Sequence, residues 1–175
     1  LTDSRAIDSS IAKKFCREVH YSVGERNYFA IGFRNDYGGW ELRSERFKGC
    51  STPKHITTID NGSDKALAFE GFMDFLSYLT IKRNDSPTCN IAVLNSVANV
   101  QKAVPFFASH RSIYTFLDND DAGRKALSEI ERLCPQSKVI NQSDFYRRHK
   151  DLNDYLRSQQ PRKRVVAKQK RGFKM

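Results

Sequence analysis

The feature that most constrains the fold is a fourfold alternation of short apolar runs and amphipathic segments after residue 65. The runs are ALAFEG (66–71), NIAVLN (90–95), SIYTFLD (112–118) and SKVINQ (137–142). Each precedes a segment with an apolar stripe at helical spacing, such as Phe72, Phe75, Leu76 and Leu79 after the first run. This alternation is typical of an α/β layer in which helices cover both faces of a parallel sheet.

The chain before this layer has a different pattern. Apolar residues four apart predict an amphipathic helix over residues 7–19, and two strand-like runs around Gly38 and Gly39 predict a β-hairpin. We therefore expect a small α+β subdomain that contains the hairpin, followed by the α/β domain and a basic tail. Their predicted bounds are residues 1–62, 63–160 and 161–175.

Much of the positive charge lies at the C-terminal end. Residues 161–175 hold seven of the 30 Lys and Arg and none of the 20 acids, whereas the rest of the chain has a net charge of +3 out of +10. A basic excess suits a polyanionic partner. For the tail itself, the composition favours a solvated, disordered end over a specific nucleic-acid arm.

Cysteine spacing and hydropathy exclude several other classes. The four cysteines form no CxxC or Cys/His pair, so the sequence has neither a local zinc motif nor a disulfide framework. No apolar run approaches the roughly 20 residues of a membrane span, and the first residues lack a signal-peptide layout. These patterns predict a soluble, cytoplasmic protein without membrane contact. Because the chain begins at Leu1, we expect it to be part of a longer protein.

Acidic residues follow two of the apolar runs. Glu70 ends the first, and Asp118 ends the third, with Asp120 two residues further on. Ligands of parallel sheets bind beyond the carboxyl ends of the strands, and residues two apart in extended chain point to the same side. Carboxylates gathered there must share protons or hold a cation, and hard oxygen ligands suit Mg²⁺ or Mn²⁺. Alternatively, Asp120 or Asp121 simply caps the following helix.

Three segments together resemble the Toprim domain, the metal-dependent catalytic module of bacterial-type primases, topoisomerases, some nucleases and recombination proteins. The segments are FEGFMDFLS (69–77), FLDNDDAGRKAL (116–127) and HKDLNDYL (149–156). The residues of these segments, together with PKHI at 53–56, are most similar to the corresponding segments of replicative primases of phage or mobile-element type. No zinc ribbon or helicase-like segment is visible, so the resemblance implies a catalytic fragment or a compact variant.

The resemblance implies a nucleotidyltransferase that makes RNA primers on single-stranded DNA from ribonucleoside triphosphates, with a replicative helicase as a further partner. The implied catalytic residues are Glu70, Asp118 and Asp120, of which Asp118 and Asp120 would bind Mg²⁺ or Mn²⁺, and Glu70 would either complete the metal shell or act as general base toward the 3′-hydroxyl. Asp151 would bind a further metal. Expected contacts to phosphate or template come from Ser96, Arg124, Lys125 and Lys54, and bases would stack on Tyr37 and Trp40. Asp74 is expected either to orient the loop by hydrogen bonding or to bind metal.

Two positions depart from the primase pattern. Asn153 replaces the second acid of an Asp-x-Asp pair, so either Asp154 compensates or a second metal binds more weakly. Asn95 and Ser96 replace a Gly-Thr turn. Two other functions therefore stay open: a Toprim nuclease of the overcoming-lysogenisation type, and a non-catalytic Toprim module that binds DNA.

Overall fold

The computed structural model describes residues 2–45 and 47–160, so the predicted basic tail at 161–175 lies outside the described residues. The helices are α1 (Thr2–Arg5), α2 (Ser9–Phe15), α3 (Phe72–Lys82), α4 (Val100–Phe107), α5 (Asp121–Leu133) and α6 (Leu152–Ser158), with 3₁₀ helices η1 (Val97–Asn99) and η2 (Ser143–Tyr146). The strands are β1 (Arg17–Val23), β2 (Arg26–Arg34), β3 (Trp40–Arg43), β4 (Lys48–Cys50), β5 (Thr57–Ile59), β6 (Lys65–Phe69), β7 (Asn90–Val93), β8 (Ser112–Phe116) and β9 (Lys138–Asn141).

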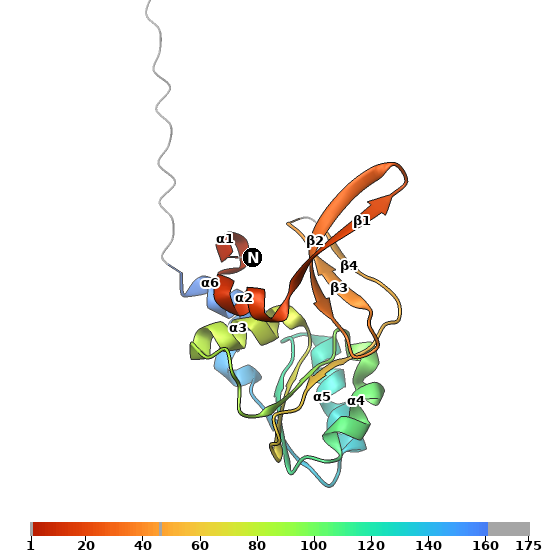
Figure 1. The fold of residues 1–175 in the computed structure, drawn as a ribbon. Helices are drawn as coiled ribbons and strands as arrows, with labels where there is room; N and C mark the ends of the chain where they lie inside the picture. The colour runs from red at the N-terminus through yellow and green to blue at the C-terminus, as the bar shows by residue number, and fades with distance from the viewer. Residues whose placement is uncertain (1, 46, 161–175) are drawn as a thin grey trace, which may run out of the picture.

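The first four strands form an antiparallel sheet in the order β1-β2-β3-β4. The predicted hairpin is present as β2 and β3, and Gly38 in its turn has a φ of 87°. The helix predicted over residues 7–19 was too long. Asp8 caps the start of α2, but the helix ends at Phe15, and Val19 pairs with Ala30 in a second hairpin, β1–β2. Figure 1 shows this hairpin extending away from the helices.

The second sheet confirms the predicted α/β fold. Its order is β5-β7-β6-β8-β9, in which β6, β7, β8 and β9 run parallel and β5 is an antiparallel edge strand. Strand β5 pairs with β7, although it lies before residue 63, the predicted start of the α/β domain. Side chains alternate between the two faces, so that Ala66 and Ala68 pack on the side of α4 and α5, and Leu67 and Phe69 on the side of α3 (Figure 1).

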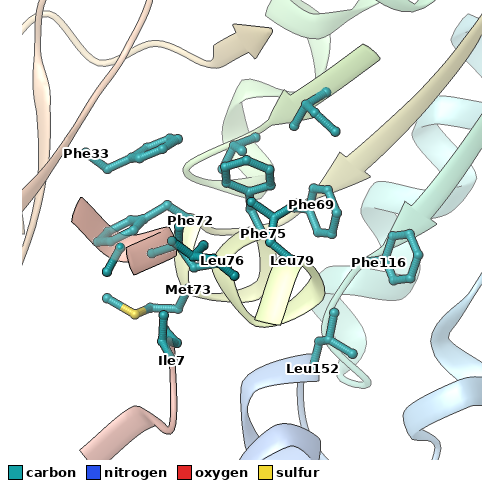
Figure 2. Close-up of a cluster of buried hydrophobic side chains, with 14 of the residues drawn as sticks. Ile7, Phe33, Phe69, Phe72, Met73, Phe75, Leu76, Leu79, Phe116 and Leu152 are labelled. Atoms are coloured by element: carbon teal, nitrogen blue, oxygen red, sulfur yellow. The ribbon is translucent and has the colours of Figure 1, made fainter. Parts of the chain in front are cut away.

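One hydrophobic cluster joins the two sheets through α3. Figure 2 shows Phe33 of β2, Phe72 and Phe75 of α3 and Phe69 of β6 in this cluster. The Phe33 and Phe72 rings stack with centroids 5.2 Å apart, and the Phe75 ring meets the Phe15 ring edge-on at 5.0 Å. The start of α3, which directly follows Glu70, is therefore fixed by packing from both sheets.

Across the described ranges, with residues 1, 46 and 161–175 left aside, every helix is too short or too polar to cross a bilayer.

Candidate active site

The acids that follow β6 and β8 lie at one edge of the parallel sheet. These strands are neighbours, with Phe69 opposite Phe116, so Glu70 and the segment to Asp118 leave the sheet side by side. The Glu70 amide donates to the Phe116 carbonyl at 3.3 Å, and the Asp118 amide donates to Glu70 Oε2 at 3.2 Å. Residues 48 positions apart are thus joined directly by a hydrogen bond.

Asp120 has a structural role in the same loop. It is the N-cap of α5, and its Oδ1 accepts a hydrogen bond from the Gly123 amide at 3.0 Å, which lowers the pKa of Asp120. The first turn of α5 passes close to the backbone of Asp118. A Cβ on Gly123 would lie only 2.1 Å from the Asp118 carbonyl oxygen. The acid loop therefore requires glycine at position 123.

The site holds more negative charge than its partners balance. Burial, and then the charge of Asp118, raises the pKa of Glu70. Burial, and then the charge of Asp151, raises the pKa of Asp118. The same two causes raise the pKa of the buried Asp74 well above its ordinary value. A cation at this edge would relieve the repulsion among these carboxylates.

Lys150 supplies a cation from within the chain. Its Nζ lies 3.5 Å from Asp118 Oδ2 and 3.7 Å from Asp120 Oδ2. The charge of Asp118 is the main cause that raises the pKa of Lys150. The sequence reasoning did not single out this lysine, although its position directly before Asp151 in HKDLNDYL was a usable signal.

The segment around Lys150 is tied to the acid loop by backbone contacts. The Asn119 amide donates to the Lys150 carbonyl at 2.7 Å, and Asn119 Nδ2 donates to the His149 carbonyl at 2.9 Å. Tyr146, which is buried, donates its hydroxyl to the Leu117 carbonyl at 2.8 Å. Asp151 then caps α6 by accepting from the Asp154 amide at 2.7 Å. These bonds hold Asp151 close enough to affect Asp74 and Asp118.

Asn153 is buried away from solvent, with 1% of its surface exposed. Its Nδ2 donates to the Arg5 carbonyl and to Ser77 Oγ, both at 2.9 Å, and its Oδ1 accepts from Arg5 Nη1 at 3.2 Å. Its amide donates to Asp74 Oδ1 at 3.3 Å. The side chain therefore crosslinks α6 to α3 and to the N-terminal segment. Asp154 instead pairs with Arg157 at 3.2 Å.

Replacing Asn153 by Asp should destabilise the protein by about 1–3 kcal/mol, because the two side-chain donors are lost in a buried place and Arg5 offsets only part of the cost. The loss should be larger near about pH 8 than near about pH 5. We expect burial at this position to raise the folded pKa of the new carboxyl above its unfolded value, so the destabilisation is small below the unfolded pKa and grows as the pH rises through the folded pKa.

Thermal unfolding at the two pH values measures this effect. The matched control is Asn141→Asp, the same change at an exposed position at the end of β9, where we expect less than about 0.5 kcal/mol. An unchanged midpoint for Asn153→Asp at both pH values would contradict the structural role of Asn153.

Of the four predicted phosphate-binding residues, Arg124 is the one whose charge acts on an acid of the edge. Arg124 pairs with Asp121 one turn into α5, and its charge contributes to lowering the pKa of Asp120. Lys125 is exposed on the same helix. Ser96 is exposed and caps η1 by accepting from the Ala98 amide at 3.3 Å. Lys54 is exposed, and its carbonyl accepts from Lys102 Nζ at 2.7 Å.

An open groove of about 1000 Å³ lies between the first sheet and helices α1 and α6. Its lining includes Arg5, Arg43 and Arg157, of which Arg157 pairs with Asp154, and the acids Asp3 and Glu45. Tyr28 and Phe29 also line it, with exposed fractions of 42% and 63%. The lining of the groove includes Met73, the neighbour of Asp74 in α3, but none of Glu70, Asp118 and Asp120. Exposed aromatic rings beside arginines are the surface that stacks and neutralises single-stranded nucleic acid.

The two aromatic residues predicted to stack on bases differ in exposure. Tyr37 is 67% exposed, with its ring centroid 4.0 Å from that of His55. Trp40 is half-buried, and the Arg34 guanidinium lies 6.0 Å from its ring centroid. Only Tyr37 therefore offers a free ring face at the surface.

A metal ion at the acid edge was expected from the sequence. Within residues 2–45 and 47–160, no group of three or more His, Cys, Asp or Glu side chains is assembled to hold one. Asp120 is engaged as a helix cap, and the Lys150 ammonium lies between Asp118 and Asp120. The donor set nevertheless fits Mg²⁺ or Mn²⁺ in its chemistry, since it offers carboxylate oxygens, excess negative charge and a place where a cation already sits.

Comparison with known families places the acid edge in a wider context. The sequence model of the Toprim-like family matches residues 67–156, which include the three segments that carry the predicted resemblance. A domain family of unknown function, DUF8464, matches residues 1–52. No curated protein matches the chain.

Several solved structures share the fold. The primase fragment of the bacteriophage T7 primase-helicase has a TM-score of 0.65 at 21% identity, over 90% of this chain and 68% of that one. A T7 primase domain bound to an RNA/DNA hybrid and dTTP, together with the lagging-strand DNA polymerase, has a TM-score of 0.63 at 21% identity, over 90% and 86%. The Aquifex aeolicus primase has 0.54 at 16%, over 90% and 53%. At these identities the likeness establishes the fold.

Proposed function

The chain belongs to the Toprim-like family, and from this membership and its fold we propose that it is the catalytic core of a DNA primase. It would join ribonucleotides into short RNA primers on a single-stranded DNA template. The observation that carries the proposal is the contact between the acids of two neighbouring strands, the hydrogen bond from the Asp118 amide to Glu70 Oε2. This contact brings together the two acids of the family pattern at the carboxyl edge of the sheet.

The acids have distinct proposed roles. Asp118 and Asp120 would hold Mg²⁺ or Mn²⁺, with Glu70 beside them and Asp151 positioned toward a further ion. When bound, the metal would neutralise charge on the nucleotide phosphates and stabilise the leaving group. Glu70 is suited to accept the proton of the attacking 3′-hydroxyl, because burial and the charge of Asp118 raise its pKa above the ordinary value of a glutamate and so make it a stronger base.

The nucleic acid would occupy the groove between the first sheet and helices α1 and α6. Arg5, Arg43 and Arg157 would neutralise the template backbone, and Tyr28 and Phe29 would stack against its bases. The further proposed contacts to phosphate or template are those of Ser96, Arg124, Lys125 and Lys54. Single-stranded DNA and ribonucleoside triphosphates are thus the proposed partners, in the cytoplasm, with a replicative helicase as a further one.

A non-catalytic module is disfavoured by the place of Asn153. The departure from Asp at this position was the main argument for lost catalysis, but the side chain packs against Arg5 and Ser77 rather than facing the acids. The overcoming-lysogenisation type of nuclease would use the same acids. The likeness to primase fragments extends over 90% of the chain, including the first sheet, which favours primer synthesis.

The test is primer synthesis on a single-stranded oligonucleotide with labelled ribonucleoside triphosphates and Mg²⁺ or Mn²⁺. We expect short RNA products that require both the metal and the template. Cleavage of the oligonucleotide without triphosphates would point to the nuclease instead. Binding of the template with neither synthesis nor cleavage under any metal condition would contradict an enzymatic function.

A further inference from the structure

The side chain of Lys150 lies where the proposed function needs a metal ion. Its Nζ is 3.5 Å from Asp118 Oδ2 and 3.7 Å from Asp120 Oδ2, so the ammonium sits between two carboxylates two residues apart. Within residues 2–45 and 47–160, both acids form their ion pairs with this lysine alone. An ammonium and a divalent cation cannot share this place, because both are positive and both need the same oxygens.

The backbone of Lys150 is fixed while its side chain is free to move. The carbonyl accepts from the Asn119 amide at 2.7 Å, and the next residue, Asp151, caps α6. The Lys150 side chain is 61% exposed, whereas that of Asp118 is 14% exposed. Its four-carbon stem can therefore swing into solvent without disturbing the loop that holds the acids.

The acids around the space between Asp118 and Asp120 favour a cation there, both in the metal-free and in the metal-bound protein. The acids are Glu70, Asp74, Asp118, Asp120 and Asp151. Besides Lys150, the Arg124 guanidinium acts on Asp120, but its own ion pair is with Asp121. Without Lys150 or a metal, Asp118 would face Glu70 and Asp151 with no adjacent positive charge.

We infer that Lys150 is an internal counter-ion, which fills the space between Asp118 and Asp120 in the metal-free protein and which a divalent cation must displace in order to bind. This inference rests on the proposed function, since it concerns the metal of that site. Lys150 thereby sets the metal concentration at which the site fills.

The test measures binding of MnCl₂ alone, without template or nucleotide, from the electron paramagnetic resonance signal of free Mn²⁺. Lys150→Met keeps much of the stem and removes the ammonium. It should bind Mn²⁺ about three- to thirtyfold more tightly than the wild type, the range expected for removing two exposed ion pairs. The matched control, Arg148→Met, removes a charge from an exposed residue two positions away and should change the affinity by less than about twofold.

A second measurement follows the lysine itself in the wild-type protein. Acylation of Lys150 by an amine-reactive ester, quantified by mass spectrometry, should speed up when Mg²⁺ is added, because a side chain freed from both carboxylates loses its proton more readily and the neutral amine is the group that reacts. Acylation of Lys138, an exposed lysine at the start of β9, should not change.

The outcomes separate the inference from the proposed function. Equal or weaker Mn²⁺ binding by Lys150→Met would overturn the inference, even if the wild type makes primers. Tighter binding by this variant would support it, even if no primer is made. If none of the three proteins binds Mn²⁺, both the inference and the metal part of the proposed function are wrong.

Discussion

Replacing Asp118 by Asn is expected to lower template-dependent ribonucleotide incorporation at least about a hundredfold, the loss typical of removing one electrostatic group from a transition state. Asp118 is the acid in contact with the Glu70 carboxylate through its amide and with Lys150 through its side chain. Asn keeps the shape and the backbone bond but removes the charge that a metal needs. The rate of primer synthesis at saturating Mg²⁺ or Mn²⁺ measures the effect.

The same variant should remain folded, since the pKa of Asp118 is raised by burial and by Asp151. Its loss of charge relieves repulsion, so the thermal midpoint near neutral pH should not fall by more than about 2 °C. Glu131→Gln, on the exposed side of α5, is the matched control and should retain nearly full activity. Primer synthesis by Asp118→Asn at more than about a tenth of the wild-type rate would remove Asp118 from the catalytic set.

The largest expected effect on stability comes from Phe75→Ala. The Phe75 ring is fully buried and contacts Phe15 of α2, Phe33 of β2 and Phe69 of β6. Removing it should cost about 3–5 kcal/mol, because the surrounding rings belong to three different elements and cannot all close the cavity. The thermal midpoint should fall by about 6–20 °C.

This variant also tests whether the two predicted parts, residues 1–62 and 63–160, unfold together. Trp40 is the only tryptophan and lies in β3, so its fluorescence reports on the first sheet, whereas far-ultraviolet circular dichroism is dominated by the helices. Because both sheets share the core around α3, we expect coincident transitions by the two probes in the wild type and in the variant. Phe29→Ala, at a 63% exposed ring, should shift both by less than about 4 °C. Separate transitions would contradict a shared core.

The parallel sheet could be predicted because burial on both faces gives its strands continuous apolar runs. Residues 66–69 and 90–93 are buried at every position, so their composition reports their structure directly. The placement of Glu70 and Asp118 at one edge then follows from topology alone, since adjacent parallel strands end at the same edge. These features depend on local sequence and a general rule of sheet packing.

The hairpin β1–β2 could not be predicted in the same way. Strand β1 is mostly exposed and has no continuous apolar run, although Val19, Tyr21 and Val23 alternate with polar residues as in a half-buried strand. Val19 also fits the spacing of Ile11 and Phe15, which extended the predicted helix past its true end at Phe15. Pairing with β2 over seven residues, a tertiary contact, overrides that spacing.

Two residues of the site were hidden from sequence reasoning for another reason. The role of Asn153 depends on hydrogen bonds to Arg5, 148 positions earlier, and that of Lys150 on a loop about thirty positions away. Such contacts depend on how α6 packs on α3 and how the segment before α6 meets the acid loop, and for Lys150 the usable sequence signal was its place directly before Asp151. The sequence therefore indicated that Asn153 replaces a metal-binding acid, although in the structure its side chain forms buried hydrogen bonds between α6, α3 and the N-terminal segment.

The tight approach of Gly123 to the Asp118 carbonyl has a consequence for how this sequence can diverge. A side chain at this position would push apart the turn that carries Asp118 and the helix that Asp120 begins. The positions of the two carboxylates would then no longer be fixed relative to each other. Among relatives whose acids have been retained, a glycine here distinguishes chains in which the pair is still held in one geometry. Relatives that have lost the glycine are the ones in which to look for a domain kept as scaffold after its chemistry has gone.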